Sequence, residues 1–126
     1  MLAAPHKTAF SAEERAYASA LLASLEAFLG DDTAMPLQYV LAFLRVVAEE
    51  GKGVSEYATA ARISNTVMTR HLLDIGDRSR NHEAGMGLVY QKRDLQDLRI
   101  NRTYATALGK SRFQKMMNAL RAVTLK

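Results

Sequence analysis

The sequence predicts a mainly α-helical fold with a small β-hairpin, and three observations lead to this prediction. Residues 54–77 contain two short helical patterns joined by a tight turn. Residues 87–106 contain two stretches of alternating side chains on either side of a polar turn, which is typical of a hairpin. Longer helical patterns precede and follow this region. A helix-turn-helix followed by a basic hairpin is a winged helix-turn-helix, an arrangement typical of small nucleic-acid-binding domains.

The composition favours one globular domain. The chain has 126 residues, of which 48% are hydrophobic and 24% are charged, and this is enough for one modest core. It contains no run of about 18 apolar residues and no secretory leader, so we expect a soluble cytoplasmic protein without a membrane partner. The absence of cysteine excludes disulfides, iron–sulfur clusters and thiolate zinc sites.

The net charge of +4 is divided unevenly along the chain. Residues 1–61 carry four Lys/Arg and eight Asp/Glu, a net charge of −4, whereas residues 62–126 carry thirteen and five, a net charge of +8. A basic surface that attracts a polyanion such as nucleic acid would explain this division. The solvated surface of an ordinary basic protein would explain it equally well.

The first helix is predicted to begin at Ser11, because Glu14 three residues later completes a capping box, and to end at Gly30. Apolar side chains at three- and four-residue spacing form a broad stripe on this helix: Tyr17, Leu21, Leu22, Leu25, Phe28 and Leu29. Such a stripe either packs on the C-terminal helix or contacts a second subunit. We prefer the contact with a second subunit.

A second helix is predicted over residues 36–50, with Pro36 in its first turn. Its main apolar stripe is Leu37, Val40, Leu41, Leu44, Val47 and Ala48, and a second apolar side is formed by Tyr39, Phe43 and Val46. A helix that is apolar nearly all round is usually buried, so this is the predicted central helix. After it, Val54 could add a short strand to the hairpin, and Ser55 is the predicted cap of the next helix.

The helix-turn-helix follows from there. The side chains of its first helix that face inward are Tyr57, Ala58 and Ala61. Ile63 fills the turn, and Ser64 is the predicted cap of the second helix. By spacing, the core side of the second helix consists of Met68, Leu72, and Leu73 or Ile75.

The opposite side of this second helix is predicted to contact duplex DNA. The candidate residues are Ser64, Asn65, Thr66, Val67, Thr69, Arg70 and His71. Asparagine and arginine can read adenine and guanine edges with two hydrogen bonds, serine and threonine commonly hold phosphates, and valine can touch a thymine methyl group. An ordinary solvated helix is the alternative. We prefer DNA contact because of the turn before this helix and the hairpin after it.

The hairpin is predicted to turn at residues 94–97. Charged side chains surround this turn: Arg93, Asp94, Asp97 and Arg99. One Asp–Arg pair could brace the loop while the other arginine reaches outward. For Arg99 we prefer insertion into the minor groove, where a narrow groove concentrates negative potential, over a solvent-exposed ion pair. The remaining cations are assigned to phosphate contacts or to plain surface: Lys92, Arg93 and Arg102.

Thr106 is placed to cap a final helix over residues 108–123, whose apolar stripe is Phe113, Met116, Met117, Leu120 and Val123. Together with the first helix it could form an intertwined dimer, although its methionines could also be ordinary core fillers. The predicted dimerisation residues are Tyr17, Leu21, Leu25, Phe28, Phe113, Met117 and Leu120. The predicted organisation is one compact unit: an N-terminal tail and dimerisation helix at 1–35, a DNA-binding domain at 36–106 and a dimerisation helix at 107–126.

Catalysis, metal binding and cofactor binding have little support in the sequence. His6, His71 and His82 are scattered, and no HExxH motif, nucleophile motif or phosphate-cradling glycine loop occurs. We therefore expect a binding protein that is not an enzyme and that needs neither a metal nor a cofactor.

One combination of residues has a further meaning: Gln38, the segment ISNTVMTRHL at 63–72, Asp97-x-Arg99, and Thr106-x-x-Gly109 with Ala105 before it. This combination resembles the MarR family of bacterial winged-helix regulators, in which leucine usually stands in the place of Ala105. The resemblance covers residues 38–109. It implies homodimers, an arginine of the wing tip in the minor groove, and regulation of transcription at palindromic sites in the bacterial cytoplasm, at the nucleoid.

Two segments differ from the usual pattern of that family. Residues 77–86 form a longer and more basic link before the wing than the family usually has. Arg78 and Arg80 in this link are predicted to contact the DNA backbone, and the alternative is a plain loop. Only one helix follows the wing, whereas the family commonly has a longer C-terminal arm.

The predicted function is sequence-specific binding of double-stranded DNA by a homodimeric transcriptional regulator, most simply a repressor. The same DNA contact could instead serve plasmid or phage replication or partition. A winged helix could also bind proteins without touching DNA. The sequence identifies no small-molecule effector.

Overall fold

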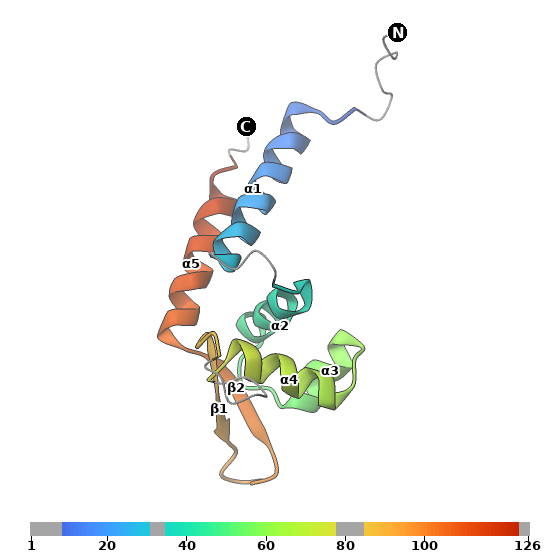
Figure 1. The fold of residues 1–126 in the computed structure, drawn as a ribbon, viewed down its shortest axis with the longest axis vertical. Helices are drawn as coiled ribbons and strands as arrows, with labels where there is room; N and C mark the ends of the chain where they lie inside the picture. Colours follow the sequence, from blue (N-terminus) through green and yellow to red (C-terminus); the bar gives the residue numbers. More distant parts are fainter. Residues whose placement is uncertain (1–8, 31–34, 78–84, 124–126) are drawn as a thin grey trace.

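A computed structural model describes residues 9–30, 35–77 and 85–123 of the chain. The elements in these ranges are α1 (Ala12–Leu29), α2 (Leu37–Ala48), α3 (Val54–Ala61), α4 (Asn65–Ile75), β1 (Val89–Arg93), β2 (Asn101–Ala105) and α5 (Ala107–Arg121). Figure 1 shows α2, α3 and α4 clustered beside the hairpin, while α1 and α5 extend away from them together. The predicted fold, mainly α-helical with a small hairpin wing after a helix-turn-helix, is confirmed.

The ends of α1 and α5 follow the capping signals in the sequence. Ser11 Oγ accepts a hydrogen bond from the Glu14 backbone N–H at 3.1 Å, and the Ser11 N–H donates to the Glu14 carboxylate at 2.8 Å. Gly30 ends α1 with a φ of 58°, in the region that favours glycine. Thr106 Oγ1 accepts from the Gly109 N–H at 2.9 Å and so caps α5. The three predicted boundary residues are therefore confirmed.

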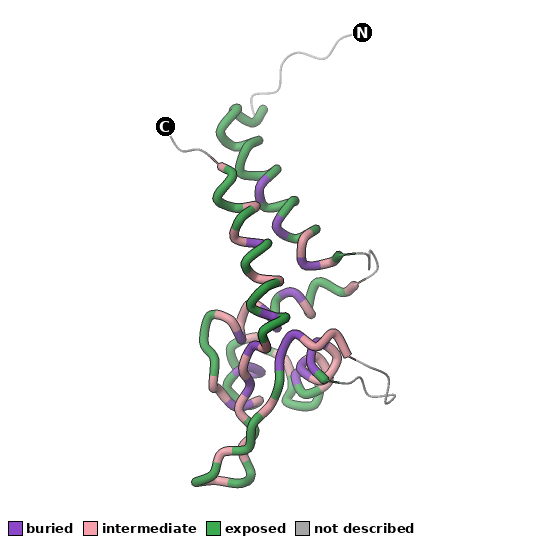
Figure 2. Tube along the Cα trace, turned by 90° about the vertical axis from the view of Figure 1, so that its left-hand side faces the viewer, coloured by how far each residue is buried: buried purple, intermediate pink, exposed green. Residues whose placement is uncertain are grey.

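Helix α1 packs along α5, which is the first of the two roles that the sequence allowed for its apolar stripe (Figure 1). The buried residues of α1 are Ala20, Ser24 and Phe28, and of these Phe28 lies in the core beside Phe43. Figure 2 shows that most of the length of both helices is otherwise exposed. Tyr17, Leu21 and Leu25 remain 41%, 56% and 38% exposed. The packing on α5 thus uses small side chains and leaves the larger ones of the stripe uncovered.

The prediction that Phe28 belongs to the dimer interface is wrong. The Phe28 side chain is completely buried, with its ring centroid 5.3 Å from that of Phe43. Phe28 therefore stabilises the core of its own chain, because it lies at the end of α1 nearest to α2.

Helix α2 buries Phe43 and Val46 of the predicted second apolar side together with Val40 of the predicted main stripe. Phe43 and Val46 are completely buried, whereas Leu37 is 61% and Leu41 is 37% exposed. The buried side packs mainly against α4 and also contacts β2. The helix begins after Pro36, which is its N-terminal cap residue instead of part of its first turn.

The connection between α2 and α3 adds a third, very short segment to the hairpin. The Gly51 N–H donates to the Thr103 carbonyl at 2.8 Å, and the Thr103 N–H donates to the Lys52 carbonyl at 3.2 Å. The isolated bridge lies between Gly53 and Arg102, one residue before the predicted Val54.

The predicted cap of α3 at Ser55 is wrong. Glu56 accepts a hydrogen bond from the Gly53 N–H at 3.1 Å, so Gly53 is the cap and the helix begins at Val54.

The two strands pair in antiparallel register, with Val89 opposite Ala105 and Arg93 opposite Asn101. The buried side chains on the inner face of the hairpin are Val89, Thr103 and Ala105. On the outer face Tyr90 and Tyr104 stack with their ring centroids 5.6 Å apart. The loop is longer than the predicted turn, since β2 begins at Asn101, and it places residues 94–100 at the tip of the wing.

Within the described residues, no helix combines the length and the apolar character needed to cross a membrane.

Candidate nucleic-acid interface

The turn between α3 and α4 has the predicted form. Arg62 adopts a left-handed conformation with a φ of 60°, which turns the chain sharply after α3. The N–H of Ile63 donates to the Ala58 carbonyl at 3.1 Å, and the Ile63 side chain packs against the core. Ser64 Oγ then accepts from the Val67 N–H at 3.1 Å and caps α4. These contacts fix the direction in which α4 leaves the turn.

Helix α4 has one buried and one open side. Met68, Leu72 and Ile75 are buried as predicted, and Leu73 is partly exposed. On the open side the exposed candidates are Ser64, Asn65, Thr66 and Thr69, and Val67 is half-buried. Asn65 Nδ2 also donates to Ser55 Oγ at 2.8 Å. The polar beginning of α4 is therefore accessible from solvent and is tied to α3.

Arg70 remains at the open side, where it lines a shallow hollow together with Asn65, Thr66, Thr69 and Leu73. It is only partly exposed, and its Nε atom is buried. Arg70 thus reaches the open surface of α4 from a partly packed stem.

His71 faces α2 more than it faces solvent. Its ring packs edge-on against Tyr39 with the ring centroids 5.3 Å apart. Burial lowers the pKa of His71, which keeps the imidazole neutral near pH 7. The Tyr39 hydroxyl donates to the Asp74 carboxylate, and this hydrogen bond, with burial, raises the pKa of Tyr39 to about 12. The aromatic and carboxylate contacts thereby hold α4 against α2.

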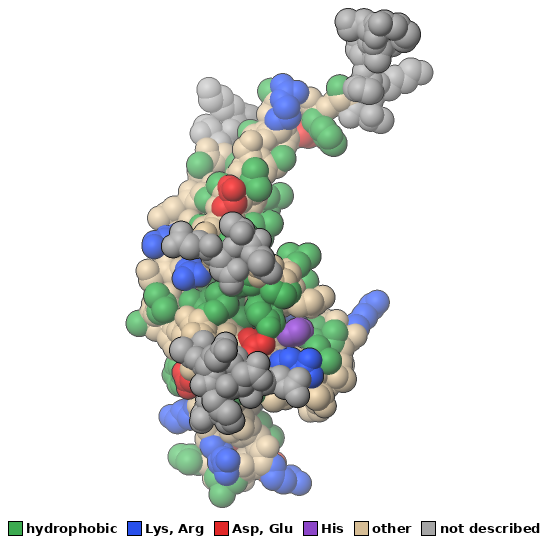
Figure 3. Space-filling model, viewed as in Figure 1, with side chains coloured by type: hydrophobic (Ala, Val, Ile, Leu, Met, Phe, Trp, Pro, Cys, Tyr) green, Lys and Arg blue, Asp and Glu red, His purple; other side chains and the backbone are tan. Residues whose placement is uncertain are grey.

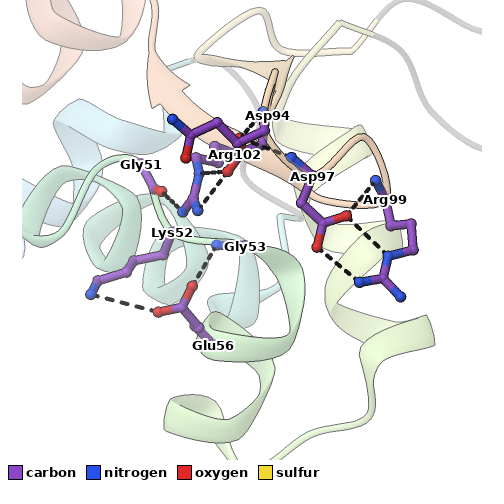
Figure 4. A network of polar contacts seen from close by, with 9 residues as sticks. Gly51, Lys52, Gly53, Glu56, Asp94, Asp97, Arg99 and Arg102 are labelled. Carbon is purple, nitrogen blue, oxygen red and sulfur yellow. Dashed lines mark hydrogen bonds and ion pairs between the residues drawn. The ribbon is translucent and has the colours of Figure 1, made fainter.

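The wing loop contains two Asp–Arg pairs with different surroundings (Figure 4). Arg99 makes a two-pronged contact with Asp97, from Nε to Oδ1 and from Nη2 to Oδ2, each at 3.0 Å. Its side chain is 88% exposed, so this pair lies in solvent. The hydrogen bond from Arg99 lowers the pKa of Asp97, and the same contact raises the pKa of Arg99.

The second pair corrects the prediction for Arg102, which was assigned to phosphate contact or plain surface. Arg102 Nε and Nη2 contact Asp94 Oδ2 at 3.0 and 2.8 Å, and Nη1 donates to the Gly51 carbonyl at 2.8 Å (Figure 4). Asp94 also accepts from the Gln96 N–H at 2.7 Å. This backbone hydrogen bond and the one from Arg102 lower the pKa of Asp94. Arg102 is therefore the brace of the loop, and Arg99 is the outward arginine.

A groove of about 450 Å³ joins the helix-turn-helix to the wing. It is lined by the start of α3, by Asn65 and Thr69 of α4, and by Arg99, Ile100 and Asn101 of the wing. The open side of α4 and the exposed arginine of the wing therefore border one continuous hollow. Ser55 and Asn101 also line it and were not among the predicted site residues. Asn101 follows Arg99 by two residues, and side chains two residues apart in an extended chain point to the same face, so this spacing could have indicated Asn101.

The other predicted contacts are outside this groove. Arg93 is exposed at the end of β1. Arg78 and Arg80 lie outside the described residues.

Figure 3 shows Lys and Arg side chains distributed around the half of the molecule that carries the hairpin, whereas hydrophobic side chains are frequent along α1. Within the described ranges, no group of three side chains is arranged to hold a metal ion.

The comparison with solved structures shows which fold this is. Tm0710 from Thermotoga maritima, a transcriptional regulator, superposes with a TM-score of 0.63 at 14% identity over 82% of this chain. Streptococcus pneumoniae FabT in complex with DNA gives a TM-score of 0.62 at 13% identity over 81%. A MarR transcriptional regulator from Methanosarcina mazei Go1 gives 0.60 at 17% identity over 86% of this chain and 70% of its own. The chain has the winged-helix fold of these regulators, as the resemblance of its motifs predicted.

The match does not extend over the full length of these proteins. This chain spans 66% of the length of both the Tm0710 and the FabT chains. No protein-family model matches the sequence, and none of the curated proteins matches it either.

Proposed function

We propose that this protein binds double-stranded DNA sequence-specifically and regulates transcription, acting as a homodimeric repressor at a palindromic operator. The observation that carries the proposal is the groove bordered by both α4 and the wing. A helix can lie in the major groove while a wing reaches the adjacent minor groove only if both face the same side of the protein, as α4 and the wing do at this groove. The fold shared with FabT, which was solved in complex with DNA, supports the same use of this side.

In this proposal the beginning of α4 reads base edges. Asn65 and Thr69 are exposed and line the groove, and Arg70 lies beside them. Asn65 is suited to adenine and Arg70 to guanine. Ser64, Thr66 and Val67 are proposed to complete the contact with phosphates and a thymine methyl group. His71 is the weakest of the predicted contacts because its ring packs on Tyr39.

In the wing, Arg99 is proposed to enter the minor groove, and Arg93 to contact phosphates. Arg99 is free to do so sterically because only Asp97 holds its exposed side chain in the described structure. The positive charge of residues 62–126 would favour approach to the phosphate backbone. Arg78 and Arg80 are also proposed to contribute positive charge near the DNA.

The homodimer is proposed from the apolar surface that α1 and α5 leave uncovered. Tyr17, Leu21, Leu25 and Leu120 are all more than one third exposed. Exposed leucines clustered on one helix pair are typical of an interface with another chain. Phe113 and Met117 are partly buried, and Phe113 also packs against the core of its own chain, so they would lie at the base of that interface.

The test is selection of duplexes from a random pool, followed by binding measurements at several salt concentrations. We expect one enriched, palindromic sequence, bound with an affinity that falls as salt rises. Thr69→Ala and Arg99→Ala should each weaken binding to it by about tenfold or more. The matched controls, Thr59→Ala on α3 and Arg121→Ala at the end of α5, change exposed residues outside the groove and should bind normally. Failure to enrich any duplex would overturn the proposal.

A further inference from the structure

The tip of the wing presents two leucines to solvent. Leu95 is 84% exposed, the largest value among the exposed large hydrophobic residues of the described chain, and Leu98 is 60% exposed. Both belong to the loop 94–100 that joins β1 to β2. Single exposed leucines are common on protein surfaces, but two of them at the end of a projecting loop form a small apolar patch.

This loop is held in one conformation by hydrogen bonds that do not involve the leucine side chains. Asp94 Oδ1 accepts from the N–H groups of Gln96 and Asp97 at 2.7 and 3.2 Å. The Asp94 N–H donates to the Ile100 carbonyl at 2.9 Å, and Arg102 fixes the other oxygen of the Asp94 carboxylate. A fixed loop loses little conformational freedom when it binds, so it can bury its apolar side chains at low entropic cost.

The charges around the leucines are positive in sum, because residues 92–102 contain four Lys/Arg and two Asp, a net charge of +2. The two carboxylates, of Asp94 and Asp97, are paired with Arg102 and Arg99. The exposed cations on either side of them along the chain are Lys92, Arg93 and Arg99. Figure 3 shows hydrophobic side chains at the end of the hairpin with Lys and Arg side chains close by. A small apolar patch flanked by cations is complementary to the minor groove of DNA. Phosphates form the walls of this groove, and the faces of stacked bases can be reached from its floor. It is not complementary to an apolar protein groove, which would leave these charges without partners.

We infer that Leu95 and Leu98 form an apolar wedge that enters the minor groove of duplex DNA and partly unstacks one base step. The inference rests on the proposed DNA binding and assigns a specific task to the wing tip. Arg99 lines the groove shared with α4, so the wedge enters the duplex next to the segment that α4 reads. The wedge makes the protein select sites by deformability, because pyrimidine–purine steps unstack more easily than stiff A-tracts.

The experiment uses the duplex that the full-length protein enriches from a random pool, with 2-aminopurine placed in turn at each step of the wing-facing segment. The fluorescence of this base rises when it is unstacked. We expect a rise at one step with the unaltered protein, and no rise with the double variant Leu95→Ala, Leu98→Ala. The double variant should also bind about tenfold more weakly, and it should lose the preference for a pyrimidine–purine step over an A-tract at that position.

Two further variants separate the wedge from other effects. Leu95→Met with Leu98→Met keeps the apolar character and should restore the fluorescence rise. Leu108→Ala removes an equally large leucine that is 51% exposed at the start of α5, away from the tip, and should leave both affinity and fluorescence unchanged. All these side chains are exposed, so none of the changes should affect folding.

The outcomes distinguish the inference from the proposed function. Tight, salt-dependent binding that is the same for the double alanine variant, with no fluorescence rise at any step, would overturn the wedge and leave the DNA-binding proposal intact. Weaker binding without any unstacking would also overturn it, because the leucines would then contact something other than base faces. If the unaltered protein enriches no duplex, the proposed function and the wedge both fail.

Discussion

Arg102 and Asp94 join the two ends of the wing loop, with Arg102 Nη2 2.8 Å from Asp94 Oδ2. The same guanidinium donates to the Gly51 carbonyl, which lies between α2 and α3. One side chain thus couples the wing to the connection that precedes the helix-turn-helix. This coupling sets the position of Arg99 relative to α4, on which the proposed simultaneous contact with two DNA grooves depends.

Replacing Arg102 by methionine should therefore loosen the wing without unfolding the domain. The amide protons of Gln96 and Asp97 should exchange faster, because Asp94 loses the partner that holds its carboxylate in place. DNA affinity should fall although Arg102 is assigned no contact with DNA, because its guanidinium is held by Asp94 and Gly51. Hydrogen exchange and binding to the enriched duplex are the two measurements. Lys110→Met, an exposed cation on α5, is the matched control. Unchanged exchange at Gln96 would contradict the role of Arg102 as a brace.

The same pair makes the wing sensitive to acid. The pKa of Asp94 is lowered in the folded chain, so its contribution to stability is fully present above the ordinary carboxylate pKa of about 4. It is lost as the pH falls through the lower, folded pKa. We expect protection of the Gln96 amide to persist at pH 5 and to decrease in more acidic solution. Asp94→Ala, which removes the acceptor of the Gln96 N–H, should show low protection at all these pH values.

A second prediction concerns the pair of Asp97 and Arg99. In the free chain the Asp97 carboxylate occupies two donors of the Arg99 guanidinium. Asp97→Asn removes this competitor and one negative charge beside the DNA, so it should strengthen binding and steepen the salt dependence. Asp77→Asn, which changes an exposed carboxylate two residues after α4, tests the effect of net charge alone. If both variants strengthen DNA binding equally, the effect comes from net charge, and freeing the Arg99 guanidinium from Asp97 does not increase the affinity.

A third prediction concerns Gly109, the last residue of the Thr-x-x-Gly motif. A Cβ atom at this position would lie 2.1 Å from the Leu88 carbonyl oxygen, so α5 crosses the start of the hairpin at a distance that only glycine permits. Gly109→Ala should lower the free energy of unfolding by about 1–3 kcal/mol, since the strain of overpacking exceeds the gain in helix propensity. Thermal unfolding of the two proteins measures this difference in stability. Ser111→Ala, on the exposed side of the same helix, should be nearly neutral, and a more stable Gly109→Ala would refute the steric argument.

A fourth prediction tests the proposed dimer. Leu21→Asp places a charge on the exposed apolar side of α1 and should shift sedimentation from dimer to monomer. It should also weaken DNA binding, because two half-sites are no longer bound together. Ser19→Asp is exposed on another side of α1 and is the control. A monomer in the unaltered protein would remove the basis of the palindromic operator.

The features that the sequence predicted well are local. Ser64 and Thr106 cap their helices because the hydroxyl and the amide that it accepts from are three residues apart. The core side of α4 follows from helical spacing for the same reason. The prediction for α2 was wrong for Leu37 and Leu41 but right for Val40, because a helix apolar on two sides contains no signal for which side α4 and β2 will cover.

The wing was harder to predict than the helices because its contacts are distant in the sequence. The bond from Arg102 to Gly51 spans 51 residues, and nothing near Arg102 distinguishes it from the other cations of the hairpin. The groove likewise combines the start of α3, α4 and the wing. The sequence predicted that Asn65, Thr69 and Arg99 belong to one site, and the role of Ser55 and Asn101 in its lining emerged only from the packing of three elements.

The last prediction concerns the contact between α4 and α2. Burial lowers the pKa of His71, with Asp74 opposing this effect and Arg70 adding to it. The unfolded chain therefore binds a proton at this residue more readily than the folded chain does. The stability contributed by the neutral imidazole is fully present above the ordinary histidine pKa of about 6.5, and it decreases as the pH falls from there toward the lower, folded pKa.

His71→Gln should therefore flatten the decrease in stability below about pH 6.5 that urea unfolding measures for the unaltered protein. DNA affinity near pH 7 should change less than it does in Thr69→Ala, because the His71 ring packs on Tyr39 while Thr69 is exposed in the groove. Tyr39→Phe is the companion variant. It keeps the aromatic contact with His71 but removes the hydrogen bond to Asp74, so it should lower stability by about 1–2 kcal/mol at every pH in this range. A His71→Gln variant with the full pH dependence of the unaltered protein would show that protonation of His71 does not control the contact between α4 and α2.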